Sequence, residues 1–183
     1  MARIFLAPFF QIKPEGQESL PKEGAFILLP KHQRWEDIPL LALASPRPLY
    51  YVAKYELFTN LFSGWYMSSL GGIPLNRARP LESRRSIRTI IALLKQGEGL
   101  VIFPEGTYFE DEVGPGRVGL IRMIRSRINV PFIPVGINYS RKMKRRRPVQ
   151  ITFGRPVCED ASVDSETLID KIMKDIARLS ALV

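Results

Sequence analysis

Lys31-His32-Gln33-Arg34-Trp35-Glu36-Asp37 is the stretch that decides the fold of this 183-residue chain. It joins an apolar run to a helical pattern and holds the only histidine. An unperturbed imidazole titrates at about pH 6.5, so His32 is a candidate neutral base at physiological pH. On a continuous helix, His32 and Asp37 would point about 140° apart and would not meet. The spacing therefore predicts a loop that leads into a helix.

Asp37 has two interpretations. Asp is a good N-cap residue, and Pro39 and Leu40 suit the first turn of a helix. Under one interpretation Asp37 only caps this helix and His32 is a surface residue. Under the other, Asp37 is the carboxylate that orients a catalytic imidazole. This stretch by itself leaves both open.

The composition predicts one domain over residues 1–183 in a reducing compartment. Hydrophobic residues make up 45% of the chain, enough for a core, and no low-complexity linker divides it. The single Cys158 excludes an intramolecular disulfide and a cysteine-built zinc site, and one histidine cannot form a histidine-rich metal site. We expect no bound metal or cofactor.

The N-terminal segment 4–10 is apolar but too short to span a bilayer, and no stretch of about 18 apolar residues occurs anywhere in the chain. It also lacks a small-residue cleavage site, so we expect neither a signal peptide nor a transmembrane helix. Two interpretations remain for this segment, an N-terminal strand and a shallow membrane anchor.

The net charge of +9 is concentrated in one basic cluster. Removing the six cations of this cluster leaves the rest of the chain at +3. Such a patch attracts anionic lipid headgroups or nucleic acid, or it is a solvated hairpin. The cluster consists of Arg141, Lys142, Lys144, Arg145, Arg146 and Arg147.

Short apolar runs alternate with helical patterns. The helical patterns lie at about 80–97, where Ile87, Ile90, Ile91 and Leu94 share one face, at 116–127 and at 164–182. This alternation predicts an α/β single-domain sandwich with a mixed, mainly parallel sheet flanked by helices. The predicted strands are 25–29, 49–52, 73–75, 100–103, 132–137 and 149–153.

Polar residues follow four of these strands. His32, Lys54, Arg77 and Glu105 each come directly after a buried run. The carboxyl ends of parallel strands meet at one edge of a sheet, where such folds build their sites. A base, a carboxylate and two cations at one edge indicate an enzyme that acts on an anionic substrate.

Six motifs in order resemble the glycerolipid acyltransferases, the glycerol-phosphate and 1-acylglycerol-3-phosphate acyltransferase family. The resemblance covers about residues 25–155. The motifs are HxxxxD within 31–37, AKYEL at 53–57, GGIPLNR at 71–77, FPEGTY at 103–108, RVG at 117–119 and VPFIPVG at 130–136.

The resemblance implies transfer of a fatty acyl group from acyl-CoA or acyl carrier protein to a lysophospholipid hydroxyl, giving phosphatidic acid from 1-acylglycerol-3-phosphate. His32 would be the general base and Asp37 would fix its tautomer. Backbone N–H groups at the helix start after Asp37 are candidate oxyanion donors. Alternatives are another acceptor, such as glycerol-3-phosphate or an amino lipid, and a non-catalytic lipid-binding protein.

The same resemblance implies a substrate-binding set. Arg77 would grip the acceptor phosphate, with Lys54 as a second cation. Glu105 would help form the acceptor site or brace its loop, while Gly106 permits a sharp turn and Thr107 caps or touches substrate.

Three positions depart from the family pattern. Lys31 and Arg34 flank the histidine where the family has Asn and Ser, and Tyr108 replaces an Arg. These departures suggest that the anionic group of the acceptor is held differently.

The expected location is the cytoplasm, peripherally associated with an anionic membrane through the basic cluster. Aromatic and apolar residues at 58–67 predict a helix that packs on the sheet or enters the bilayer, with packing favoured. The aromatics lie away from the basic cluster and no nucleic-acid motif is present, so we do not expect a nucleic-acid partner.

Overall fold

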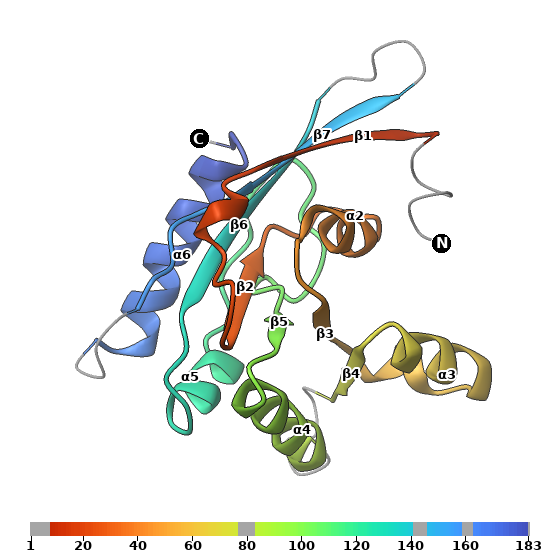
Figure 1. Cartoon of the computed structure of the whole chain (residues 1–183), viewed down its shortest axis with the longest axis vertical. Coiled ribbons are helices and arrows are strands. Elements are labelled where there is room, and N and C mark those ends of the chain that lie inside the picture. Colours follow the sequence, from red (N-terminus) through yellow and green to blue (C-terminus); the bar gives the residue numbers. More distant parts are fainter. Residues whose placement is uncertain (1–7, 77–82, 141–145, 159–162, 183) are drawn as a thin grey trace.

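The computed structural model describes residues 8–76, 83–140, 146–158 and 163–182. Strands and helices alternate along the chain, as predicted (Figure 1). The strands are β1 (Phe10–Glu15), β2 (Phe26–Pro30), β3 (Leu49–Lys54), β4 (Gly72–Leu75), β5 (Gly99–Val101), β6 (Phe132–Tyr139) and β7 (Arg147–Phe153). The helices are α2 (Asp37–Ala44), α3 (Leu61–Ser69), α4 (Arg84–Lys95), α5 (Gly119–Arg125) and α6 (Ser165–Leu179), with short 3₁₀ turns η1 (Gln17–Ser19) and η2 (Tyr55–Phe58).

The described strands form one sheet in the order β1-β7-β6-β2-β5-β3-β4. Strands β6, β2, β5, β3 and β4 are parallel, whereas β7 runs antiparallel to β6 and β1 runs parallel to β7. The predicted mixed, mainly parallel sheet is therefore confirmed. The carboxyl ends of β2, β5, β3 and β4 lie along one edge, which we call the site rim.

The central strands β2, β5 and β6 are buried on both faces, which explains why they read as continuous apolar runs. Along β2, Phe26 and Leu28 pack with the apolar face of α2, whereas Ile27 and Leu29 point to the opposite face. That second face is covered by residues of α4, α5 and α6. Because alternate side chains of β2 pack into the two cores, β2 lies in the middle layer of a three-layer sandwich. This packing holds the start of the loop that follows β2 in place.

The predicted apolar stripes of two helices are confirmed. Ile87, Ile90 and Leu94 of α4 are buried, and Gly97 ends this segment with a positive φ of 86°. Helix α6 begins after Asp164, whose side chain accepts a hydrogen bond from the Thr167 N–H. Among the helices described, none has the length and apolarity needed to cross a bilayer.

Helix α3 contradicts one expectation. Packing of residues 58–67 on the sheet was favoured, yet none of the residues of α3 is buried. Leu61, Phe62 and Trp65 are 96%, 78% and 68% exposed. Figure 1 shows α3 projecting beside β3 and β4, beyond the other helices. The prediction was wrong because β4 is an edge strand, and α3 lies past the two layers of helices that cover the sheet.

Candidate active site

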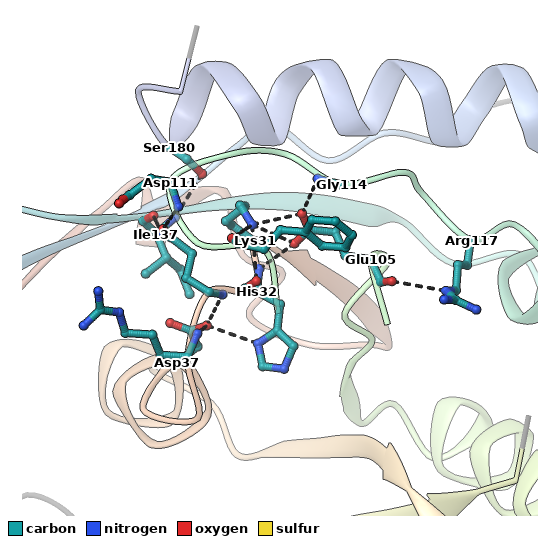
Figure 2. Close-up of polar contacts among 12 residues, drawn as sticks. Lys31, His32, Asp37, Glu105, Asp111, Gly114, Arg117, Ile137 and Ser180 are labelled. Atoms are coloured by element: carbon teal, nitrogen blue, oxygen red, sulfur yellow. Dashed lines mark hydrogen bonds and ion pairs between the residues drawn. The ribbon is translucent and has the colours of Figure 1, made fainter. Parts of the chain in front are cut away.

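His32 and Asp37 meet at the site rim, on the loop between β2 and α2. The imidazole Nδ1 lies 3.1 Å from Asp37 Oδ2, and Figure 2 shows the ring facing this carboxylate. A carboxylate only accepts hydrogen bonds, so Nδ1 carries the proton of the neutral ring and Nε2 keeps its lone pair. The His32 side chain is 11% exposed, and no hydrogen bond occupies Nε2 within the described residues. This nitrogen is therefore available as a base.

Asp37 is fully buried and organises the whole loop. Its Oδ2 also accepts hydrogen bonds from the backbone N–H groups of Gln33 at 2.6 Å and Arg34 at 2.8 Å. These donors precede Asp37, which is the first residue of α2, so it does not cap the helix as one interpretation supposed. The carboxylate instead binds the backbone of the preceding turn and, through Nδ1, fixes the position of the His32 ring.

Tyr139 completes the environment of Asp37. Its hydroxyl donates a 2.6 Å hydrogen bond to Asp37 Oδ1, which leaves Oδ2 for the imidazole. Burial, and next the nearby Asp37 charge, raise the pKa of Tyr139 well above its ordinary value. The phenol therefore stays a donor throughout the physiological range. Since β6 is parallel to β2, Tyr139 at its carboxyl end lies on the same rim.

A buried ion pair joins the His32 loop to the segment after β5. Lys31 Nζ lies 2.9 and 3.0 Å from the two carboxylate oxygens of Glu105, and both side chains are fully shielded from solvent (Figure 2). Glu105 also accepts from the His32 N–H at 2.8 Å and the Gly114 N–H at 2.8 Å. Lys31 donates further to the Phe109 carbonyl at 2.6 Å.

Of the two roles expected for Glu105, this geometry fits the brace and not a substrate contact, because its oxygens are engaged and 1% of the residue is exposed. Lys31 is likewise turned inward, so it is not free to hold an acceptor phosphate. The change from the family pattern at Lys31 is thus compensated inside the protein.

Arg34 is also engaged within the protein. It forms an ion pair with Glu110, and its guanidinium lies over the Tyr139 ring at 5.3 Å. Lys31 and Arg34, two of the departures from the family pattern, therefore both have partners within the protein.

Two aromatic rings form the walls around His32. Phe103 stacks on the imidazole with ring centroids 3.7 Å apart, and the Tyr108 ring meets it edge-on at 4.4 Å. These rings limit how far the imidazole can rotate and keep water from most of its surface.

The helix start after Asp37 does not supply the predicted oxyanion donors. The N–H groups of Asp37, Ile38 and Leu40 donate to the carbonyls of the preceding turn, and Pro39 has no N–H. That expectation is wrong because the helix begins in a tight turn whose carbonyls use its first donors.

The remaining predicted residues divide into three groups. Lys54 and Thr107 are exposed at the site rim. Gly106 makes the sharp turn expected of it, with a φ of 71°. Arg77 lies outside the described residues.

Most residues of the basic cluster also lie outside the described residues. Of its members, Arg146 and Arg147 are described, at the start of β7. The others, Arg141, Lys142, Lys144 and Arg145, lie outside the described residues. In the part of the chain that the structure describes, no group of three or more His, Cys, Asp or Glu side chains is arranged to hold a metal ion.

An apolar pocket of about 230 Å³ lies behind Phe103, on the face of the sheet opposite α2. Arg117 stands at this pocket and donates through Nε to the Glu105 carbonyl at 3.2 Å, as Figure 2 shows. The apolar part of the lining is formed by Leu75, Ile87, Ile102, Phe103, Leu120 and Met123. Phe103 thus separates the imidazole from this pocket.

Sequence reasoning missed Tyr139 and Gln33. Tyr139 follows the predicted strand 132–137 by two residues, so the strand-end rule that selected His32 and Glu105 would have found it. Gln33 donates to the Ile137 carbonyl at 2.8 Å and accepts from the Asp111 N–H at 3.1 Å. No local signal marks this residue, because its partners are 78 and 104 positions away.

Comparisons with known proteins agree with this geometry. The family model described as Acyltransferase matches residues 11–138. The chain is 30% identical over 149 residues to the 1-acyl-sn-glycerol-3-phosphate acyltransferase of Bacillus subtilis, covering 80% of this chain and 73% of that protein. The enzyme of that name from Streptococcus pneumoniae is 29% identical over 163 residues, covering 84% of this chain but 60% of its own length.

A solved structure of an acyltransferase is similar to this fold. The crystal structure of the 1-acyl-sn-glycerophosphate acyltransferase PlsC from Thermotoga maritima superposes with a TM-score of 0.74 and 26% sequence identity, covering 97% of this chain and 73% of that one. The ordered motifs, the fold and the family match lead to one conclusion: the chain belongs to the glycerolipid acyltransferase family and is an O-acyltransferase.

Proposed function

We propose that this protein transfers a fatty acyl group from an acyl thioester to the free hydroxyl of 1-acylglycerol-3-phosphate, giving phosphatidic acid. The observation that carries the proposal is the His32–Asp37 pair, with Nδ1 fixed by the carboxylate and Nε2 open at the site rim. The names of the similar bacterial enzymes support the choice of acceptor. The donor is acyl-CoA or an acyl carrier protein thioester.

The chemistry follows from the pKa of an alcohol, which lies far above 7, so the hydroxyl must lose its proton as it attacks. Nε2 of His32 takes this proton while the oxygen bonds to the thioester carbonyl carbon. Asp37 stabilises the imidazolium that forms. When the tetrahedral intermediate collapses, the C–S bond breaks and the imidazolium returns its proton to the thiolate. The reaction consumes no metal or redox cofactor.

Lys54 supports the acceptor site. It is the last residue of β3, which lies two strands from β2, a separation of about 10 Å at strand spacing. A long, exposed lysine at this position reaches toward a phosphate whose neighbouring hydroxyl sits at His32. Arg77, by resemblance to the family motif, is the second cation, and Thr107 is an acceptor contact beside the Gly106 turn.

The pocket behind Phe103 supports the acyl group. Apolar side chains from β4, α4 and α5 dominate its lining, and it adjoins the ring that stacks on His32. A thioester held with its carbonyl at Nε2 has its chain within reach of this pocket. Burial of each methylene there contributes about 0.8 kcal/mol.

A second acceptor class is favoured by one observation. Tyr108 stands where the family pattern has an arginine, and its ring lies against His32. An acceptor whose headgroup is less anionic than a phosphomonoester, such as a hydroxylated amino lipid, needs fewer cations at this edge. It is the alternative to 1-acylglycerol-3-phosphate.

Peripheral membrane association is part of the same proposal, because the acceptor and product are membrane lipids. Arg146 and Arg147 at the start of β7, with the other cations of the basic cluster, supply attraction to an anionic cytoplasmic leaflet of about 1 kcal/mol per residue near the surface.

The test is transfer by purified protein, with products identified by mass spectrometry. Each of acyl-CoA and acyl carrier protein thioester is offered with 1-acylglycerol-3-phosphate, glycerol-3-phosphate and a hydroxylated amino lipid. His32→Ala is expected to lower kcat about 10²–10⁴-fold, the usual share of general base catalysis. Ser126→Ala, at an exposed helix end, is the matched control and should retain activity.

Two results would contradict the proposal in different ways. Wild-type turnover that survives His32→Ala, with the variant folded by circular dichroism, would remove the imidazole from the mechanism. Wild-type protein that acylates none of the acceptors but binds their vesicles would instead favour a non-catalytic lipid-binding protein.

A further inference from the structure

The segment after Lys54 exposes several apolar side chains, with one exposed carboxylate, Glu56, between Tyr55 and Leu57. From Leu57 to Asn76 the sequence contains no charged residue, and the run is flanked by Glu56 and Arg77. Tyr55 and Leu57 of η2 are about half exposed, and Leu61, Phe62 and Trp65 of α3 are mostly exposed. We call these five residues the α3 patch.

The α3 patch contributes nothing to the interior. None of its members belongs to either core cluster, and α3 has no buried residue. Single exposed apolar residues are ordinary, but a contiguous group that includes a Phe and a Trp marks a surface that another apolar phase covers. Contact of these side chains with water is unfavourable, and a partner that covers them would remove it.

The patch begins at the same edge as the base. η2 starts immediately after the carboxyl end of β3, and His32 follows the carboxyl end of the parallel strand β2. Other exposed rings follow parallel strands at this edge, namely Trp35 after β2 and Tyr108 after β5. An apolar phase that meets the α3 patch therefore lies beside the opening to Nε2.

We propose that the α3 patch is the element that enters the bilayer, with Phe62 and Trp65 as its anchors. This inference rests on the proposed function, in which the acceptor is a membrane lipid. Apart from Glu56 near its start, the segment is uncharged and rich in aromatic residues, which suits the boundary between headgroups and acyl chains, where Trp and Tyr concentrate. Lys54 at one end and the cations of β7 at the same edge complement the anionic headgroups that surround such a segment.

This placement also explains how a substrate reaches a nearly buried histidine. The acceptor stays in the leaflet, and its headgroup needs only to rise to the site rim beside α3. The protein then lies on the membrane with the sheet edge facing it, and the helices α4, α5 and α6 remain outside. In this arrangement the bilayer covers the face of α3 that the rest of the protein leaves exposed.

The experiment uses the full chain in a Trp35→Phe background, which leaves Trp65 as the only tryptophan. Vesicles of phosphatidylglycerol and phosphatidylcholine should shift Trp65 emission to the blue, and brominated acyl chains should quench it. In co-sedimentation, Phe62→Ser/Trp65→Ser should weaken partitioning into the same vesicles by about tenfold per residue. Phe62→Leu/Trp65→Phe, which keeps the apolar area, should partition within threefold of wild type.

Activity separates this inference from the proposed function. Transfer to a short-chain, water-soluble 1-acylglycerol-3-phosphate should be unchanged in Phe62→Ser/Trp65→Ser, whereas transfer to the long-chain acceptor in vesicles should fall at least tenfold. Wild-type protein that fails with both acceptors would refute the proposed function, while the vesicle measurements would still decide the docking face.

Three results would overturn the inference. Trp65 emission that does not respond to vesicles would show that the patch stays in water or in protein. Equal sedimentation of wild type and Phe62→Ser/Trp65→Ser would place the docking surface elsewhere. A wild-type dimer that becomes monomeric in this variant, measured by light scattering without lipid, would make the patch an interface between two copies of the chain.

Discussion

Lys31→Met should destabilise the protein strongly, because it leaves the Glu105 carboxylate buried without its cation. The wild-type pair is fully shielded, with Nζ 2.9 and 3.0 Å from the carboxylate oxygens. After the substitution, Glu105 keeps only two backbone donors, from His32 and Gly114. Removing one partner of a buried pair costs about 3–5 kcal/mol. At about 2–4 °C per kcal/mol for this chain length, Tm should fall by about 6–20 °C.

The assay is urea unfolding followed by circular dichroism, with thermal unfolding alongside it. Arg122→Met is the control, because Arg122 pairs with Glu166 at the surface, where the two side chains are 59% and 58% exposed. Loss of such a pair costs about 1 kcal/mol or less. Lys31→Met/Glu105→Gln, which removes both charges, should recover more than half of the loss. A cost below about 1 kcal/mol for Lys31→Met, or a double variant less stable than the single one, would refute the brace.

Two further perturbations test the site and the packing behind it. Tyr139→Phe removes a hydrogen bond to the Asp37 carboxylate and should cost about 1.5–3 kcal/mol of stability at pH 7. Because burial raises the pKa of Tyr139 above its unfolded value, its contribution is complete below about pH 10 and is lost as the pH rises further, so wild type and variant should converge in alkaline unfolding curves. A constant difference from pH 7 to 11 would contradict this. Gly136→Ala should cost about 1–3 kcal/mol in urea unfolding, because its Cβ would lie 2.2 Å from the Leu179 backbone. Gly119→Ala, with open space around it, is the control and should be neutral or stabilising.

The sheet and most helices could be predicted because the pattern of apolar residues within each segment is sufficient to identify a buried strand or an amphipathic helix. Buried parallel strands are apolar on both faces, and the α4 stripe repeats with the helical period, so periodicity alone located them. The His32 loop was predictable from the five-residue spacing to Asp37, which no regular helix accommodates. These signals lie within a few residues of the features that they identify.

The pairing of Lys31 with Glu105 was not predicted because it is non-local. The two residues are 74 positions apart and meet only because β2 and β5 are neighbours in the sheet, which the order of strands along the chain does not reveal. Nothing near Lys31 in the sequence identifies Glu105 as its counter-ion. The exposure of α3 was missed for a related reason: aromatic residues on a helix predict burial unless the neighbouring strand is known to be the sheet edge.

The Lys31–Glu105 brace limits how this enzyme can be recombined with its relatives. A chimera between this protein and one that lacks either member of the pair would leave the other charge buried without its counter-ion, at a cost of about 3–5 kcal/mol. The segments after β2 and β5 should therefore be exchanged together wherever the two parents differ at either position.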